Sequence, residues 1–374
     1  MKWRFLGTTA LKLVTRHSPI ALHFGALDTR LLQLNGGPGG WSVRAAEVLE
    51  GTGGSRHNAA VEALGPRLKD LKLRGKDCLV SVSGDEVAVS LVPVDPHNRN
   101  RMSQTLKETA MRSVQDPEGV IYRYMPLSSS DDDETDATRE ELLLLALGQS
   151  EMRRCMSAVD ALRMRPVSLE VSAFPLARTM AATQADMEDP WGFLHLGYGH
   201  SIFGIVQKGE LRFLKPMQLN GERLLNTLEK ALNRFNAPDP AALSEMLLNA
   251  DGPVEETNRV VNRKSLQVVN ENAIGHAAEI VHALRMESEA LAQEVRACLR
   301  HFANRHRGAK LAHVQIAGMG AKLPEVETAL GNALGLPTQV AEPFTALGIT
   351  APQHVLEEQH LWCIPLGLAM RGYA

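Results

Sequence analysis

The chain has 374 residues, of which 44% are hydrophobic and 22% charged, an ordinary globular composition that allows two compact lobes or one large domain with insertions. Its 40 basic and 43 acidic residues leave a formal net charge of −3, which excludes the strongly basic footprint of a nucleic-acid-binding protein. The longest uninterrupted apolar run, Leu142 to Leu147, is far shorter than the about 20 residues that cross a membrane. The four cysteines form no CxxC pair and the 13 histidines no HxxxH pair, so their spacing indicates neither a metal nor a redox site and suits a reducing compartment.

Residues 1–17 mix apolar side chains with basic ones. Lys12 interrupts the apolar stretch that a signal peptide requires, and no small-residue cleavage site follows. We therefore interpret these residues as a mobile leader, with a membrane-surface helix as the alternative.

The first half of the chain opens with a strand from Ile20 to Phe24, a turn at Gly25 and a second strand from Asp28 to Leu34. The glycines at 36–40 and 51–54 predict loose loops on either side of a short segment near Val48. Apolar spacing then predicts the following further elements: a helix over 59–73, strands over 78–82, 86–94 and 142–147, a helix over 150–162, and extended structure at 169–171. The run Ser128 to Asp136 consists of serines and acids that cannot bury apolar surface, so we expect an exposed or disordered loop there.

The second half repeats this opening. A strand over 193–196, a glycine-bearing turn over 197–201 and a strand over 202–206 precede a turn at Lys208 and a strand over 211–214. The segment 221–303 is predicted to be mostly helical, with a loop near Gly252. A buried strand over 313–317, a glycine turn over 318–321 and a helix over 364–371 complete the chain. Two similar strand-turn-strand units, each leading a mixed α/β half, indicate an internal duplication.

A tight glycine turn between strands exposes backbone N–H groups, and two such turns across a cleft can hold the phosphates of a nucleotide. A plain hairpin is the ordinary alternative for each turn taken singly. The candidate nucleotide-binding residues are His23, Gly25, Asp28, Thr29, His195, Gly197, Gly199, His200, Ser201, Gly318, Gly320 and Ala321.

The order of the three glycine turns, with a helical insertion between the second and third, resembles the actin/Hsp70/sugar-kinase superfamily. Within it, the chain is similar to the PilM family, the actin-like proteins of type IV pilus assembly and relatives of FtsA. The similar segments are 18–34, 74–84, 169–178, 318–324, 335–344 and 365–372. The resemblance implies an α/β fold with two actin-like lobes, a duplicated ribonuclease H-like unit with an inserted subdomain in each lobe.

The resemblance also implies the domain boundaries. The first lobe would comprise 18–82, 165–190 and 345–374, with a peptide-groove subdomain inserted at 83–164. The second lobe would comprise 191–222 and 307–344, with a helical subdomain inserted at 223–306.

The chain departs from the family where a phosphate turn begins. The family has an aspartate there that helps to hold hydrated Mg²⁺ or a water, whereas this chain has His23 and His195. Leu27 and Tyr198 also replace small residues in the two turns. Because Mg²⁺ prefers oxygen ligands and imidazole prefers softer metals, we expect ATP and Mg²⁺ to bind weakly or not at all, and we assign no catalytic residue. The two histidines either fill the strand ends or cap an anion without a metal.

The resemblance implies a cytoplasmic scaffold of a type IV pilus or type II secretion-like assembly machine, held at the inner face of the inner membrane through a partner. The implied partner is a PilN-like inner-membrane protein, bound through its cytoplasmic N-terminal peptide. A functional ATP-binding actin-like ATPase and a self-associating, FtsA-like filament protein stay open as alternatives. A sugar or metabolite kinase is disfavoured, because no aspartate follows the second turn to act as a base towards a substrate hydroxyl.

Overall fold

The structure is a computed structural model of the whole chain. It describes residues 17–37, 40–50, 56–82, 86–95, 98–114, 119–126, 140–219, 221–234, 270–306, 308–323 and 326–371. The predicted leader, except His17, and the acidic run Ser128 to Asp136 lie outside the described residues.

The first sheet has five strands in the order β3-β2-β1-β4-β8. Its strands are β1 (Ile20–Phe24), β2 (Asp28–Gly37), β3 (Gly40–Glu50), β4 (Asp77–Val82) and β8 (Arg165–Val171). β1 pairs antiparallel with β2 and parallel with β4. On the outer sides, β3 pairs antiparallel with β2, and β8 pairs parallel with β4. Every residue of the central strand β1 is buried, which explains its nearly continuous apolar sequence.

The second sheet repeats this arrangement in the order β11-β10-β9-β12-β13. Its strands are β9 (Trp191–Leu196), β10 (Ser201–Gln207), β11 (Glu210–Met217), β12 (Val314–Ala317) and β13 (Thr338–Val340). β9 pairs antiparallel with β10 and parallel with β12, as β1 does with β2 and β4. The two histidine-bearing strands therefore hold equivalent central places in separate sheets, and the predicted two-lobed, duplicated α/β fold is confirmed.

A three-stranded sheet is inserted after β4, in the order β5-β7-β6. It consists of β5 (Val87–Val94), β6 (Val120–Pro126) and β7 (Glu140–Gly148), with α2 (Arg99–Ser113) packed on one face. Alternate residues of β7 face opposite sides of the inserted sheet. Leu142 and Leu144 belong to a hydrophobic cluster that includes residues of α2. Leu143 and Leu145 belong to the core that includes residues of the second sheet. The run of leucines is continuous because both faces of β7 are covered.

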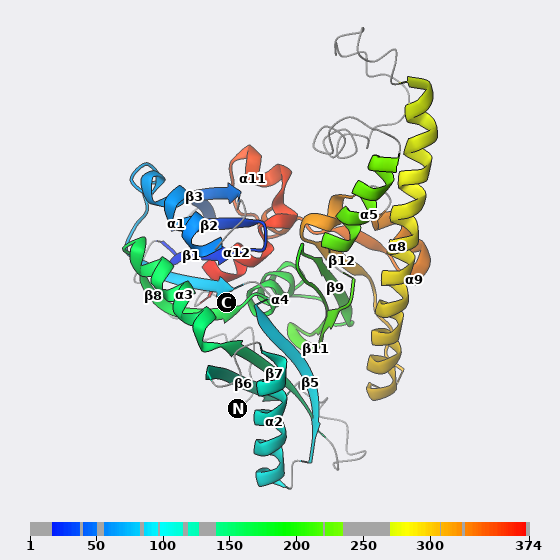
Figure 1. Cartoon of the computed structure of the whole chain (residues 1–374), viewed down its shortest axis with the longest axis horizontal. Coiled ribbons are helices and arrows are strands. Elements are labelled where there is room, and N and C mark those ends of the chain that lie inside the picture. The colour runs from blue at the N-terminus through cyan, green and yellow to red at the C-terminus, as the bar shows by residue number, and fades with distance from the viewer. Residues whose placement is uncertain are drawn as a thin grey trace.

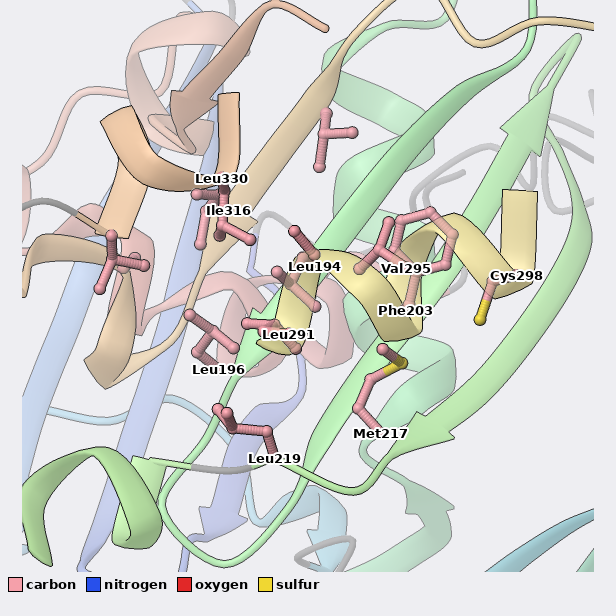
Figure 2. Packing of buried hydrophobic residues seen from close by; sticks show 14 of the residues in the cluster. Leu194, Leu196, Phe203, Met217, Leu219, Leu291, Val295, Cys298, Ile316 and Leu330 are labelled. Carbon is pink, nitrogen blue, oxygen red and sulfur yellow. The ribbon is translucent and has the colours of Figure 1, made fainter. Parts of the chain in front are cut away.

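Helices cover the outer faces of the two large sheets (Figure 1). α1 (Arg56–Arg67) and α3 (Gln149–Ala161) share a hydrophobic cluster with the first sheet. The long helix α8 (Asn270–Arg305) packs on the second sheet together with α5 (Gly221–Arg234) and α9 (Val326–Leu334). Figure 2 shows this packing, with Leu291 and Val295 of α8 directed at Leu194 and Phe203 of the sheet.

Two helices lie between the large sheets. α4 (Ala173–Thr183) packs on the second sheet, and α12 (Cys363–Ala369) packs on the first. They cross so closely that a Cβ atom on Gly367 would lie 1.8 Å from the carbonyl oxygen of Pro175. Arg178 donates to the Gly367 carbonyl at 2.6 Å, and Thr179 Oγ1 donates to the Cys363 carbonyl at 2.7 Å. This crossing is the tightest backbone approach between the two halves among the glycines described.

The remaining short elements are η2 (Met319–Lys322), α10 (Pro343–Ala346), α11 (Gln353–Glu357) and η3 (Gln359–Leu361). None of the helices formed by the described residues is both long and apolar enough to cross a membrane.

Two local predictions were wrong or shifted. The segment around Val48, expected to be short and bordered by loops, is the 11-residue strand β3. β3 lies at the edge of the sheet, where pairing with β2 rather than burial along its length fixes the extended conformation. The helix expected over 59–73 is α1, which begins at Arg56 and ends at Arg67, one residue after Pro66. The helical segment expected over 221–303 is helical in α5 and α8, and its middle lies outside the described residues.

Candidate functional site

The first turn is organised around His23, the fourth residue of β1. His23 is paired in register with Ser81 of β4, and its Nδ1 lies 2.7 Å from Ser81 Oγ. The side chain is 7% exposed. The pKa of His23 is lowered to about 4, mainly by burial, with the charges of His200 and Arg30 also lowering it and the charge of Asp28 and the contact with Ser81 raising it. The imidazole is therefore neutral at pH 7.

Gly25 closes the first turn by donating its N–H to the Asp28 carbonyl at 2.8 Å. A Cβ atom at Gly25 would lie 2.8 Å from that same oxygen, so the turn requires glycine there. The Asp28 carboxylate is held by Arg30, with Nε 2.8 Å from Oδ2. Arg30 is buried and stacks over the Trp362 ring at 5.1 Å. Asp28 thus has a fixed cationic partner within its own strand.

The second turn is organised around His195 in β9, which pairs with Ala317 of β12. A Cβ atom at Gly197 would lie 2.6 Å from the His200 carbonyl, so this turn is equally tight. The carbonyls of Gly197 and Tyr198 accept the N–H groups of Gly221 and Glu222 at 2.7 and 2.9 Å. These first N–H groups of α5 are engaged by the turn, although a helix N-terminus can otherwise receive an anion.

The histidines of the two turns come together between the lobes. The rings of His195 and His200 have centroids 5.8 Å apart, and His200 Nε2 lies 3.4 Å from Ser172 Oγ at the start of α4. Burial is the largest cause of a pKa of His195 well below its ordinary value, and the charges of His200 and His23 lower it further. His195 Nδ1 is buried and makes no hydrogen bond.

The third turn approaches His195 from β12. Gly318 has φ +86°, and a Cβ atom there would lie 2.6 Å from the Leu196 carbonyl and 3.0 Å from His195 Nε2. The Gly318 N–H donates to the carbonyl of His360 at 3.0 Å. Burial, with smaller effects of Lys322 and Arg30, lowers the pKa of His360 to about 3. Neutral imidazoles therefore line the place where the three turns meet.

These side chains are poorly suited to binding a metal–triphosphate complex. A neutral imidazole supplies one donor, one acceptor nitrogen and no negative oxygen, whereas Mg²⁺ takes oxygen ligands in octahedral geometry. The one carboxylate in the first turn, Asp28, is paired with Arg30. The chemistry that remains is hydrogen bonding by neutral rings and backbone groups.

The comparisons with known proteins agree with this architecture. Residues 281–373 match the model of a family described as type IV pilus assembly protein PilM. The solved structure of a PilM-PilN type IV pilus biogenesis complex superposes with a TM-score of 0.69 at 18% identity, covering 96% of this chain and 100% of the other. The ethanolamine utilization protein EutJ from Carboxydothermus hydrogenoformans superposes with a TM-score of 0.52 at 13% identity, covering 96% and 90%. A comparison with curated proteins gave no match.

The chain is similar to PilM in fold and, over residues 281–373, in sequence. The structural likeness shows that the fold of PilM extends over almost the whole chain, while the family model matches its C-terminal part. That part includes the end of α8, the third turn and α12.

The remaining candidate residues lie in or beside the turns, but their side chains differ in accessibility. Thr29 and Ser201 are buried inside their strand pairs. Gly320 faces Leu196 and Leu224, and Ala321 belongs to the core of the second lobe. Gly199 lies in the second turn and is half-buried. The assignment of these residues to a nucleotide-binding site stays a prediction.

Sequence reasoning did not single out four side chains that shape this place: Ser81, Ser172, Arg30 and His360. Ser81 and Ser172 are fully buried hydroxyls that contact His23 and His200. A buried serine at the carboxyl end of an otherwise apolar strand, as in Cys78 to Val82, was the available signal. His360 could not be found in this way, because its carbonyl is placed by the packing of η3 against Gly318.

Proposed function

We propose that this chain is a cytoplasmic scaffold of a type IV pilus or type II secretion-like assembly machine. It would bind the cytoplasmic N-terminal segment of a PilN-like inner-membrane protein and be held at the inner face of that membrane by this partner. The observation that carries the proposal is the likeness of almost the whole chain to the PilM-PilN complex.

The cleft supports a scaffold rather than an ATPase. His23 and His195 are buried and neutral where the family has carboxylates, so they neither coordinate Mg²⁺ nor offset the charge of a triphosphate. Asp28 is held by Arg30. Two neutral rings packed at the junction of the lobes would preserve the shape of an actin-like cleft without the negative charge of the carboxylates.

The inserted three-stranded sheet is the proposed place of peptide binding, within residues 83–164. Its strands reach the cores of both lobes, because Val87 and Leu147 pack with the first sheet while Leu143 and Leu145 pack with α4 and the second sheet. A peptide bound at this junction would contact a surface whose shape depends on both lobes. This would suit a scaffold that transmits occupancy of the peptide site to the rest of the fold.

A direct test is a titration of the full chain with a fluorescently labelled peptide. The peptide has the sequence of the cytoplasmic N-terminal segment of a PilN-like, single-span inner-membrane protein, and a scrambled peptide of equal composition is the control. We expect a Kd of about 1–100 μM, typical of a short peptide in a preformed groove. Equal binding of the two peptides, or no binding at about 1 mM, would refute the proposal.

The alternative is an ATP-binding, actin-like ATPase or an FtsA-like filament protein. It shares the fold and differs in the cleft, so Mg·ATP affinity and ATP-dependent sedimentation decide between them. ATP-dependent assembly of the purified chain would favour the filament alternative.

A further inference from the structure

A second cluster of polar side chains lies away from the interlobe cleft, where the first sheet meets the inserted three-stranded sheet. His57 on α1, Glu86 immediately before β5 and Glu151 on α3 each direct one ligand atom into a space where all three lie within 4.8 Å of one another. His57 Nδ1 is 3.5 Å from Glu151 Oε1. Among the described residues, this is the one group of three histidine, cysteine or acidic side chains with such spacing.

The cluster is screened from water by the hydrophobic core around it. His57 is 2% exposed and its ring lies 4.6 Å from that of Phe24. The side chain of Glu151 is 13% exposed, and its buried Oε1 accepts no hydrogen bond. Arg154, on the solvent side, contacts the other oxygen of Glu151. Two carboxylates at one place are costly to bury unless cations balance both.

The donor set is one imidazole and two carboxylates, which suits divalent transition metals. Ligands about 2.0–2.1 Å from a tetrahedral zinc ion are about 3.4 Å from one another. The 3.5 Å between His57 and Glu151 matches that separation. Water would supply the fourth ligand, as in zinc sites with three protein ligands.

We propose that His57, Glu86 and Glu151 form a zinc site that joins the inserted sheet to the helices of the first lobe. Glu86 lies in the connection from β4 to β5, so a metal bound to it would tie that connection to both α1 and α3. The competing arrangement has no metal and a protonated His57 between the two carboxylates.

The experiment is an isothermal titration of the chelator-treated, tag-free full chain with ZnCl2. Absorption of the Co²⁺-loaded protein in the visible range reports a site of low coordination number. We expect a single equivalent of zinc to bind with a Kd below about 1 μM, and the melting temperature to rise with zinc concentration. Absence of zinc binding by the wild-type chain overturns the proposal in favour of the protonated histidine.

Substitutions locate the site. Glu86→Gln and His57→Gln each remove a ligand and should weaken zinc binding at least tenfold and abolish the thermal shift. Glu62→Gln, exposed on the same helix as His57, and His354→Gln, exposed on α11, are matched controls that should bind zinc like the wild type. Should His57→Gln fold poorly, Glu86→Gln decides by itself, since it replaces a half-buried connection residue by an isosteric amide. Unchanged zinc affinity in Glu86→Gln would place the zinc elsewhere and overturn the proposal.

Discussion

Replacing Gly367 by alanine should damage the junction between the lobes more than any other glycine-to-alanine change in a described helix. The new Cβ atom would lie 1.8 Å from the Pro175 carbonyl oxygen and 2.7 Å from Thr179 Oγ1. Since both neighbours belong to α4, and the closest atom is backbone, α12 and α4 must move apart.

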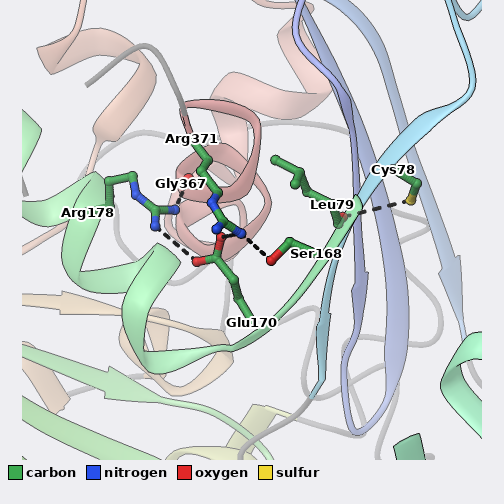
Figure 3. A network of polar contacts seen from close by, with 7 residues as sticks. All are labelled: Cys78, Leu79, Ser168, Glu170, Arg178, Gly367 and Arg371. Carbon is green, nitrogen blue, oxygen red and sulfur yellow. Dashed lines mark hydrogen bonds and ion pairs between the residues drawn. The ribbon is translucent and has the colours of Figure 1, made fainter. Parts of the chain in front are cut away.

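The magnitude follows from what that movement breaks. Overpacking a close contact costs about 1–3 kcal/mol. Separating the helices also stretches the bonds from Arg178 to Gly367 and from Thr179 to Cys363, each contributing about 0.5–1.5 kcal/mol. We therefore expect Gly367→Ala to lower the free energy of unfolding by about 2–6 kcal/mol. Figure 3 shows how directly Arg178 reaches the helix carrying Gly367.

Urea unfolding followed by tryptophan fluorescence and circular dichroism measures the effect, because Trp191 lies in the second sheet and Trp362 at the start of α12. The unfolding midpoint should fall by about 1 M or more. Gly65→Ala is the matched control: Gly65 is also helical, and a Cβ atom there meets nothing within 4 Å. Because Gly65 precedes Pro66, which disfavours a helical residue with a Cβ atom, the gain in helix propensity is partly offset and alanine there should change stability by less than about 1 kcal/mol. A Gly367→Ala midpoint equal to the wild type would refute the close crossing of the two helices.

Three further outcomes are expected. Glu170→Ala should lower the free energy of unfolding by about 2–4 kcal/mol, because it leaves two arginines without their shared carboxylate (Figure 3). Asp77→Ala, which removes an exposed ion pair on the neighbouring strand, should lower it by less than about 1 kcal/mol. Equal losses for the two variants in urea unfolding would contradict this. The pKa of His23 is about 4 when folded against 6.5 in its ordinary state, so the unfolded chain takes up the proton first and stability falls as pH drops from 6.5 to 4, by at most about 3 kcal/mol. His23→Asn should reduce the slope of that part of the stability–pH curve, to which His195 and His360 also contribute, and an unchanged slope would show that His23 has no such effect. Titration with Mg·ATP should detect little or no binding, and His23→Asp with His195→Asp should restore some affinity; a low-micromolar Kd for the wild type would disprove the role given to the histidines.

Sequence alone determined the duplication and the elements with a strong local signal. Ile20 to Phe24 and Trp191 to Leu196 are apolar because each strand is central and covered on both faces, and such burial leaves a direct mark on composition. The leucine run of β7 and the helix after it were predicted for the same reason. The resemblance of these glycine turns and of several other segments to known families then indicated an actin-like fold.

Only the tertiary structure decided which residues meet. β3 escaped prediction because its pairing with β2 fixes its extended backbone while few of its side chains are buried. The need for glycine at 367 depends on a carbonyl nearly 200 positions away in the chain. His57, Glu86 and Glu151 likewise come from three separate segments, brought together by the packing of α1 against α3. The local sequence indicates whether a residue is buried, but it does not indicate which residues far away in the chain it contacts. Those contacts depend on how the helices and sheets pack.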